Sequence, residues 1–222
     1  MDLVESNFEA ILFDVDGTLL DSIEDLTDSM NSTLNHFGFP THGVERYKYF
    51  VGDGMENLVK RALPDSVGTD SAIVSESLQM MRQTYDHNWK NKTRPYPGIP
   101  ELLDGLTDHK VKMTVLSNKP DYFIQKIVQE LLPSWRFEIV MGERPSVPRK
   151  PDPSSAIEIA ERLGIRPENF LYLGDTATDM LTANAAGMYA LGALWGFRNA
   201  EELLSSGAKQ LMRTPLEVLR LL

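Results

Sequence analysis

The sequence contains no cysteine, no long apolar run and no excess of positive charge. Without cysteine there is no disulfide, no thiolate nucleophile and no cysteine-ligated zinc. No run approaches the ~18 apolar residues of a transmembrane helix, and the acidic start lacks the basic region of a signal peptide. The net charge of −10 disfavours phosphate backbones and anionic membrane surfaces. We therefore expect a cytoplasmic globular protein without nucleic-acid or membrane partners, either a monomer or a homodimer.

The most informative stretch is Phe8–Asp21, which reads FEAILFDVDGTLLD. Its apolar run, Ile11-Leu12-Phe13, has the length of a buried strand and ends in Asp14-Val15-Asp16-Gly17-Thr18. Two carboxylates one residue apart at the end of a buried strand are costly unless a cation lies between them. The stretch therefore predicts a divalent metal next to a reactive carboxylate.

The chain after this strand is helical for about seventy residues. A weakly amphipathic helix is expected over 22–37 and closes at Gly38. Further helices are expected over 44–63 and 70–89, with Gly52-Asp53-Gly54 inside the first of these ranges. No convincing strand lies between 22 and 92. The block has the organisation of a separate helical lobe inserted after the first strand.

The second half of the chain alternates strands with helices. After the turn-rich connector 94–98, strands are expected over 111–118, 137–141, 169–173 and 188–195, and helices over 120–132, 154–163 and 178–186. Thr214-Pro215-Leu216-Glu217 has capping-box spacing and predicts a terminal helix. This alternation predicts an α/β fold with a doubly wound, parallel, Rossmann-like sheet. We expect residues 1–20 and 94–222 to form this core and residues 21–93 to form the helical domain.

Chemically active residues follow four of the predicted strands, where open α/β sheets bind ligands. They are Asp14 and Asp16, Ser117 and Asn118, Lys150, and the pair Asp175 and Asp179. Their types suit phosphoryl transfer. Asp14 can act as a carboxylate nucleophile, and Asp16 as the acid that protonates the leaving oxygen and the base that then activates water.

The same residues can bind a metal and a phosphate. Mg²⁺ prefers a few carboxylate and water oxygens, for which we name Asp14, Asp175 and the backbone carbonyl of Asp16, with Asp179 behind them. Ser117, with Asn118 beside it, and Lys150 can hold the remaining phosphate oxygens. Taken singly, each has a plainer explanation: Asp175 and Asp179 as helix caps, Ser117 as a loop hydroxyl, Lys150 as a surface lysine. Together, however, they follow successive predicted strands in this order, which favours a common phosphate and metal site over the separate explanations.

With these residues assembled, the chain resembles the haloacid dehalogenase superfamily over nearly its whole length. The resemblance lies in DVDGT (14–18), Ser117 in LSNK, Lys150 in KPDP and GDTATD (174–179). It implies a Rossmann-like core, Mg²⁺, an aspartyl-phosphate on Asp14 and an α-helical cap inserted after the first motif. An aspartate at position 16 points within this superfamily to a phosphatase or a phosphomutase.

Within the superfamily the chain is most similar to phosphoglycolate phosphatases, through residues 49–63, 94–106, 114–120 and 174–188. This likeness implies that the substrate is 2-phosphoglycolate and that Gly52, Asp53 and Gly54 form the cap loop that meets it. The same three residues also fit a simple turn between helices. The loop with Glu143-Arg144-Pro145-Ser146 departs from the family pattern.

Three other functions remain open on the sequence. A phosphomutase of the β-phosphoglucomutase kind shares all four motifs. A pyrophosphatase or a nucleotidase is a variant of the same chemistry. A catalytically silent binding protein would be expected to lack a motif carboxylate, and none is missing.

Overall fold

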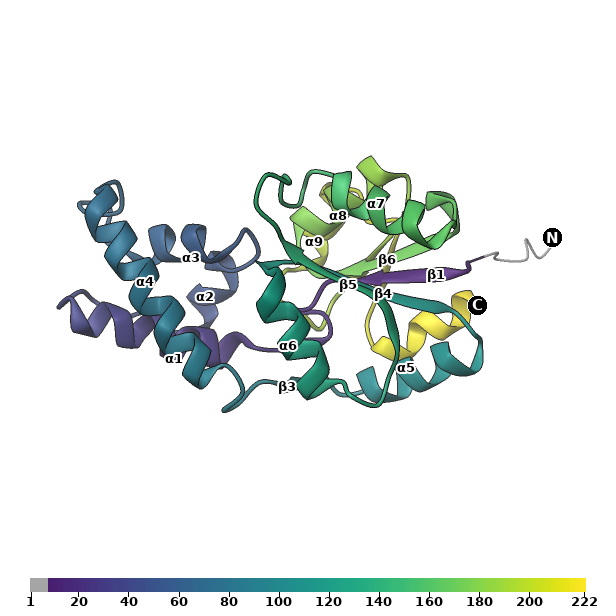
Figure 1. The fold of residues 1–222 in the computed structure, drawn as a ribbon, viewed down its shortest axis with the longest axis horizontal. Coiled ribbons are helices and arrows are strands. Elements are labelled where there is room, and N and C mark those ends of the chain that lie inside the picture. Colours follow the sequence, from purple (N-terminus) through teal and green to yellow (C-terminus); the bar gives the residue numbers. More distant parts are fainter. Residues whose placement is uncertain (1–7) are drawn as a thin grey trace. The chain divides into compact units, whose positions relative to one another are not determined.

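The structure, a computed structural model, describes residues 8–222 and divides into two compact units (Figure 1). The core unit takes the chain up to Leu19 and from Pro95 to Leu222, and the cap unit is Leu20–Arg94. Residues 1–7, which the sequence assigns to the core, lie outside the described part. None of the helices in residues 8–222 is long and apolar enough to cross a membrane.

The core unit is built on a six-stranded parallel sheet with the order β5-β4-β1-β6-β7-β8. Its strands are β1 (Ala10–Phe13), β4 (Lys112–Pro120), β5 (Phe137–Glu143), β6 (Phe170–Gly174), β7 (Tyr189–Ala193) and β8 (Gln210–Met212). All four residues of β1 are fully buried, as expected for the central strand of a parallel sheet covered on both faces. The predicted α/β fold is confirmed.

Helices cover both faces of this sheet, with α7 (Ser154–Leu163) and α8 (Ala177–Ala186) on one side (Figure 1). The other side carries α5 (Ile99–Asp108) and α6 (Asp121–Leu131). Alternate strand residues such as Leu12 and Tyr172 join Ile159 and Met180 in one buried apolar cluster. The core is completed by α9 (Ala200–Ser205) and two 3₁₀ helices, η1 (Pro167–Asn169) and η2 (Pro215–Leu221).

The strand register brings the motif residues to one edge of the sheet. Phe13, the last residue of β1, pairs with Val115 of β4 and with Leu173 of β6. The residues that follow these positions therefore leave the sheet at the same level. The strand order also reverses between β1 and β6, and such a switch point is where open α/β sheets bind ligands.

The cap unit contains four helices, α1 (Ile23–His36), α2 (Val44–Phe50), α3 (Met55–Ala62) and α4 (Ser71–Asn88). The range 44–63, expected to be helical, forms two helices with Gly52-Asp53-Gly54 as the turn between them. Gly52 and Gly54 between them have φ angles of 124° and 87°, which right-handed helix does not allow. The predictions of α1 and α4 are confirmed, and Asp70 caps α4 through its carboxylate.

Two short linkers connect the units, and they pair with each other as β2 (Leu20–Asp21) and β3 (Arg94–Pro95). Next to β3, the buried carboxylate of Asp25 accepts hydrogen bonds from the backbone N–H groups of Lys92 and Thr93 and from the Thr93 hydroxyl. The start of α1 is therefore tied to the chain that returns to the core.

The terminal helix begins at Pro215 as predicted but is a 3₁₀ helix without the expected capping box. Thr214 makes no side-chain cap, and Glu217 Oε2 instead accepts from the backbone N–H of Arg213 at 2.8 Å. The helix packs closely on α5, since a Cβ added at Gly105 would lie 2.6 Å from Leu219 Cδ1.

Candidate active site

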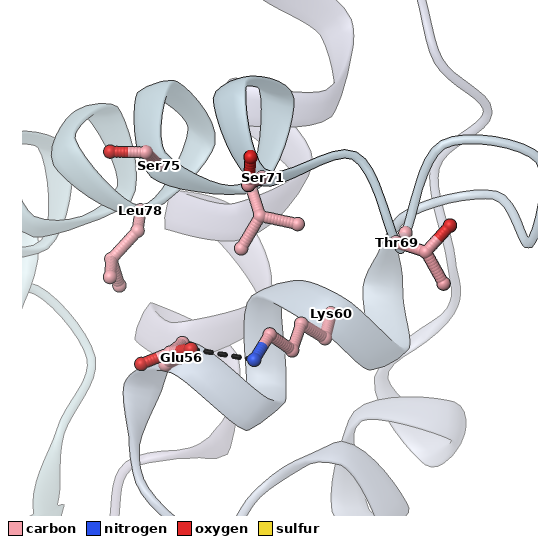
Figure 2. A pocket seen from close by; sticks show the side chains of 8 residues that line it. Glu56, Lys60, Thr69, Ser71, Ser75 and Leu78 are labelled. Carbon is pink, nitrogen blue, oxygen red and sulfur yellow. Dashed lines mark hydrogen bonds and ion pairs between the residues drawn. The ribbon is translucent and has the colours of Figure 1, made fainter.

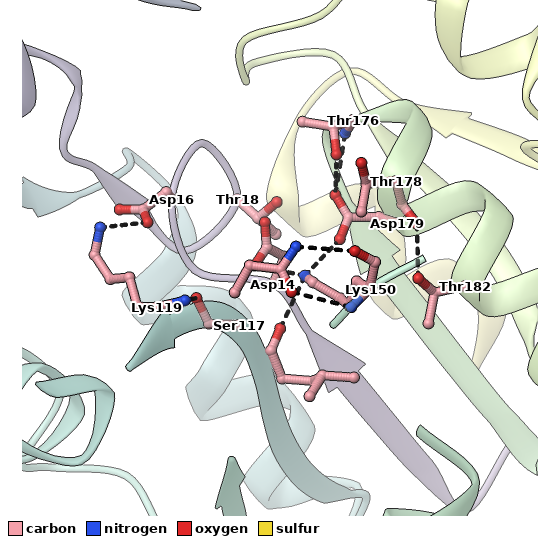
Figure 3. Close-up of polar contacts among 12 residues, drawn as sticks. Asp14, Asp16, Thr18, Ser117, Lys119, Lys150, Thr176, Thr178, Asp179 and Thr182 are labelled. Atoms are coloured by element: carbon pink, nitrogen blue, oxygen red, sulfur yellow. Dashed lines mark hydrogen bonds and ion pairs between the residues drawn. The ribbon is translucent and has the colours of Figure 1, made fainter. Parts of the chain in front are cut away.

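The centre of the candidate site is the buried ammonium of Lys150 between two carboxylates (Figure 3). Lys150 Nζ lies 2.9 Å from Asp14 Oδ1 and 2.7 Å from Asp179 Oδ1, and it donates to the carbonyl oxygen of Leu116 at 3.0 Å. Burial by itself lowers the pKa of Lys150, but Asp14 and Asp179 more than offset this and hold that pKa well above its usual value. Lys150 is therefore a fixed positive charge and not a surface lysine.

Asp175 follows β6 and is held by the loops around it. Its Oδ1 accepts from Thr18 Oγ1 at 3.0 Å, and its Oδ2 accepts from the backbone N–H of Phe197 at 2.8 Å. Two glycines allow this close approach. A Cβ at Gly17, where φ is +82°, would lie 2.2 Å from Asp175 Oδ2, and one at Gly196 would lie 2.3 Å from Asp175 Cβ.

Asp179 acts both as a helix cap and as a partner of Lys150. Its Oδ2 accepts from the backbone N–H of Thr176 at 3.1 Å and from the Thr176 hydroxyl at 2.7 Å, at the start of α8. The capping explanation is thus correct for Asp179 but incomplete, because its other oxygen faces Lys150.

The donor set fits a divalent cation. One carboxylate oxygen from each of Asp14, Asp175 and Asp179 lies within 4.8 Å of the others. Burial, reinforced by the charge of Asp179 and opposed by Lys150, raises the pKa of Asp14 to about 7. Burial, with Asp179 and Asp14, also raises the pKa of Asp175 well above its usual range. Carboxylates crowded and buried in this way become stable as anions once a cation joins them.

Asp16 points to a different partner from its neighbours in the motif. Its Oδ2 lies 2.5 Å from the Nζ of Lys119, and this pair sits to one side of the group formed by Asp14, Lys150 and Asp179 (Figure 3). The side chain of Asp16 is therefore separate from the carboxylates that could bind a metal. The expectation that Asp16 offers a metal only its backbone carbonyl is compatible with this direction.

The end of β4 supplies Ser117 and Asn118, both buried. Ser117 Oγ accepts from the backbone N–H of Lys119 at 3.2 Å. The side chain of Asn118 turns to the main chain of Lys150: Oδ1 accepts from its N–H at 3.0 Å and Nδ2 donates to its carbonyl oxygen at 3.2 Å. The sequence predicts Asn118 as a phosphate-binding residue, but these two hydrogen bonds engage its side chain with the main chain of Lys150.

The loop that departs from the family pattern, 143–146, is anchored to α7. Arg144 makes a two-bond ion pair with Glu158, with Nη1 and Nη2 at 3.0 and 2.5 Å from the two carboxylate oxygens. This ion pair fixes the start of the loop that leads to Lys150.

The predicted specificity loop, Gly52, Asp53 and Gly54, lies between α2 and α3 of the cap unit. The Asp53 carboxylate pairs with Arg61 Nη2, while Arg61 Nη1 donates to the carbonyl oxygen of Phe50 at 3.1 Å. Asn57 Nδ2 donates to the carbonyl oxygen of Asp53 at 2.9 Å. The loop is thus held by its own helix, and Arg61 is engaged rather than simply solvated.

The cap unit also has a surface pocket of about 570 Å³ between α3 and α4 (Figure 2). Lys60 Nζ on its wall is paired with Glu56 at 2.6 Å, and the remaining lining is Gly68, Thr69, Ser71, Val74, Ser75 and Leu78. The two ionisable residues of the lining therefore offset each other's charge.

The model of the haloacid dehalogenase-like hydrolases matches residues 11–193. The chain belongs to this family. The match spans all four motif regions, and the resemblance seen in the sequence is confirmed.

Named relatives agree with this assignment. The chain is 32% identical over 196 residues to phosphoglycolate phosphatase 1 of Pseudomonas aeruginosa. The aligned region covers 87% of this chain and 72% of that protein. It is 31% identical over 216 residues to a phosphoglycolate phosphatase of Nitrosococcus oceani, covering 96% of each. A crystal structure of a putative phosphoglycolate phosphatase from Lactobacillus delbrueckii has a TM-score of 0.89 at 30% identity, covering 96% of this chain and 97% of that one. The predicted enzyme class, a phosphatase of the haloacid dehalogenase family, is confirmed.

Two contributors to the site were absent from the sequence prediction. Thr18 orients Asp175 from within the first motif, and Lys119 pairs with Asp16 from a position two residues after Ser117. The sequence feature that could have indicated a role for Lys119 is its positive charge two residues after Ser117, a predicted phosphate ligand at a strand end. Its partner could not be predicted from the sequence because Asp16 lies in the loop after β1, 103 positions from Lys119.

Proposed function

We propose that this hydrolase is a Mg²⁺-dependent phosphatase that cleaves 2-phosphoglycolate through a phospho-aspartate on Asp14. The observation that supports the proposal best is the position of Asp14, at the switch point of the sheet between a fixed ammonium and a second carboxylate. The names of the relatives described above support the substrate.

The residues that would hold the metal are Asp14, Asp175 and the backbone carbonyl of Asp16, with Asp179 behind them. Bound Mg²⁺ supplies positive charge that offsets the repulsion between the Asp14 carboxylate and the phosphate. The carboxylates of Asp14, Asp175 and Asp179, offset only by Lys150, carry two negative charges in excess, which is the charge that one divalent ion neutralises.

The chain's own groups carry the two chemical steps. In the first, a carboxylate oxygen of Asp14 attacks phosphorus in line, the bond from phosphorus to the ester oxygen breaks, and Asp16 gives that oxygen its proton. In the second, water adds to phosphorus, Asp16 takes one of its protons, and the bond between phosphorus and Asp14 breaks. The products are glycolate and inorganic phosphate, and both aspartates return to their starting state.

Lys150 and Ser117 hold the phosphate in this proposal. Lys150 contributes a point charge beside the nucleophile, and the Ser117 hydroxyl a hydrogen bond from the adjacent strand end. For Asn118 we assign the phosphate contact to its backbone N–H, since its side chain binds Lys150.

We assign substrate choice in part to the cap loop Gly52–Gly54. Its shape depends on Asp53, which pairs with Arg61. Asp53→Ala should therefore change the ratio of kcat/KM between 2-phosphoglycolate and sugar phosphates, whereas Glu56→Gln on the next helix should leave it unchanged.

A direct test measures phosphate release from a panel of 2-phosphoglycolate, sugar phosphates, pyrophosphate and nucleotides. Chelation should abolish release and Mg²⁺ should restore it. Asp14→Asn should lose nearly all activity, whereas Asp108→Asn on the exposed end of α5 should lose none. Normal metal-dependent release by Asp14→Asn would refute the mechanism.

The panel also separates the second candidate, a phosphomutase of the β-phosphoglucomutase kind. This enzyme would interconvert sugar phosphates with little net release of phosphate. A preference for pyrophosphate or nucleotides would change the substrate and keep the reaction, and inactivity on the whole panel would favour a silent binding protein.

A further inference from the structure

The ion pair between Lys119 and Asp16 places a second fixed cation at the candidate site. The atoms Lys119 Nζ and Asp16 Oδ2 are 2.5 Å apart, and the two side chains are only 9% and 13% exposed. Lys150 occupies a different place, between Asp14 and Asp179. The site therefore separates its two lysines, with one beside the nucleophile and the other beside the acid/base residue (Figure 3).

The main chain at Lys119 is held tightly by its surroundings. Its N–H donates to Ser117 Oγ at 3.2 Å. On the neighbouring strand, a Cβ added at Gly142 would lie 2.6 Å from the carbonyl oxygen of Lys119, and Gly142 N–H donates to Asp121 Oδ1 at 2.8 Å. The base of the Lys119 side chain is thus fixed on the same edge as the phosphate ligand Ser117.

The position beside Asp16 defines what Lys119 can reach. If Asp16 protonates the ester oxygen, that oxygen lies one hydrogen bond from the Asp16 carboxylate, whose Oδ2 lies one hydrogen bond from the ammonium. The ester oxygen and the ammonium are then within roughly 5 to 7 Å of each other. In 2-phosphoglycolate two covalent bonds separate the ester oxygen from the carboxylate carbon. The carboxylate of a bound substrate therefore falls in the neighbourhood of the Lys119 ammonium, which has three donors and can serve two anions together.

Charge makes the same region the natural place for this carboxylate. Asp14, Asp16, Asp175 and Asp179 all repel an anionic substrate, so its second negative group needs a cation of its own. Lys119, which lies beside Asp16 at the strand end that carries Ser117, is such a cation.

We propose that Lys119 is a specificity residue that binds the substrate's own carboxylate and so selects phosphate esters with an anionic group one carbon from the ester oxygen. The proposal rests on the phosphatase function proposed above. It makes Lys119 the counterpart of Lys150: one lysine for the carboxylate, the other for the phosphate.

The test compares 2-phosphoglycolate with ethyl phosphate, which has the same length and an alkoxide leaving group but no carboxylate. Lys119→Met should lower kcat/KM for both esters, because Asp16 loses its buried partner. The loss for 2-phosphoglycolate should be about 10- to 100-fold larger than the loss for ethyl phosphate, the range of a hydrogen bond to a charged group. Lys119→Arg should keep part of the preference. Lys112→Met, on the exposed far end of β4, is the matched control and should change neither.

A binding measurement gives a second readout that needs no turnover. Calorimetry compares 3-phosphonopropionate, in which a CH₂ replaces the ester oxygen of 2-phosphoglycolate, with propylphosphonate, which lacks the carboxylate. The wild-type protein should bind the first more tightly, and Lys119→Met should remove most of the difference while thermal unfolding shows a folded protein.

The outcomes distinguish this inference from the proposed function. If the wild type releases phosphate and Lys119→Met slows both esters equally, Lys119 only positions Asp16 and the inference is wrong. It is also wrong if neither ester is affected, or if the two phosphonates bind equally. If the wild type hydrolyses no phosphate ester, the proposed function has failed, and the inference falls with it.

Discussion

The side-chain amide of Asn118 brackets the main chain of Lys150, accepting from its N–H at 3.0 Å and donating to its carbonyl oxygen at 3.2 Å. The same lysine directs its ammonium at Asp14, Asp179 and the carbonyl oxygen of Leu116. The end of β4 therefore sets the place of a residue that is 32 positions away in the sequence.

Asn118→Ala should lower kcat/KM by about 10-fold or more, because loss of two hydrogen bonds lets Lys150 move from Asp14 and from the phosphate that we assign to it. Steady-state kinetics on 2-phosphoglycolate measure this value. Asn184→Ala is the matched control, since the Asn184 side chain also makes two hydrogen bonds to main chain, at the carbonyl oxygens of Met180 and Gly207, but away from the site. An unchanged kcat/KM would mean that the Asn118 side chain does not hold Lys150 in place.

The metal-free protein should lose stability as pH rises from about 4 to 7. Burial raises the pKa of Asp14 to about 7 in the folded protein, against its ordinary value of 3.8. Between these values the folded state keeps a proton that the unfolded state has lost, so the free energy of unfolding falls by up to about 1.4 kcal/mol per pH unit for each such group. Asp175, whose pKa is also raised, acts in the same direction.

Scanning calorimetry between pH 4 and 8, with and without Mg²⁺, checks this expectation. Bound Mg²⁺ favours the ionised carboxylates, so its stabilising effect should grow with pH. Asp14→Asn should flatten the pH dependence of the metal-free protein. A metal-free protein that is more stable at pH 7 than at pH 5 would contradict the raised pKa values.

Gly17→Ala should disrupt the site because the added Cβ would lie 2.2 Å from Asp175 Oδ2, at a φ of +82°. Since the clash is with a buried carboxylate, we expect a loss of about 2 kcal/mol or more in the free energy of unfolding and a large loss of Mg²⁺ affinity. Gly43→Ala is the control: nothing lies within 4 Å of its Cβ and its φ is −74°. Chemical denaturation and metal titration give the two readouts, and normal Mg²⁺ binding by Gly17→Ala would count against Asp175 as a ligand.

Asp25→Ala should destabilise the cap unit by about 3 kcal/mol, because it leaves the buried N–H and hydroxyl of Thr93 and the N–H of Lys92 without their acceptor. Asp28→Ala removes only an exposed ion pair with Lys92 and should cost less than about 0.5 kcal/mol. Urea denaturation compares the two variants. Equal stability would show that the carboxylate of Asp25 does not hold the linker.

The sheet and its helices were predictable because their signals are local. Buried strands such as Ala10–Phe13 are short apolar runs, and helix ends are marked by residues such as Gly164 and Gly187, which adopt φ angles of 66° and 75°. The helix α5 was missed although its buried residues, Ile99, Leu102, Leu103 and Leu106, have helical spacing. Pro100 and Gly105 masked that pattern, and Gly105 is present because Leu219 packs against it.

One error came from a competing hydrogen bond that the sequence does not reveal. The capping box at Thr214 failed because Glu217 accepts from the N–H of Arg213 instead. The turn at Gly52–Gly54 was one of the two explanations that the sequence offered, and only the structure shows that Arg61 holds it.

The sequence by itself determined the chemistry at each strand end, starting with the stretch from Phe8 to Asp21. The order of the motifs along alternating strands and helices is enough to predict a phosphatase of this family. Residue types, and the apolar runs that mark the strands before them, can be identified from short stretches of sequence. Only the tertiary structure decided the partners: Lys150 with Asp14 and Asp179, Lys119 with Asp16, and Asn118 with the main chain of Lys150. These pairs join residues on different strands and loops, and the side-chain directions that form them depend on register and packing.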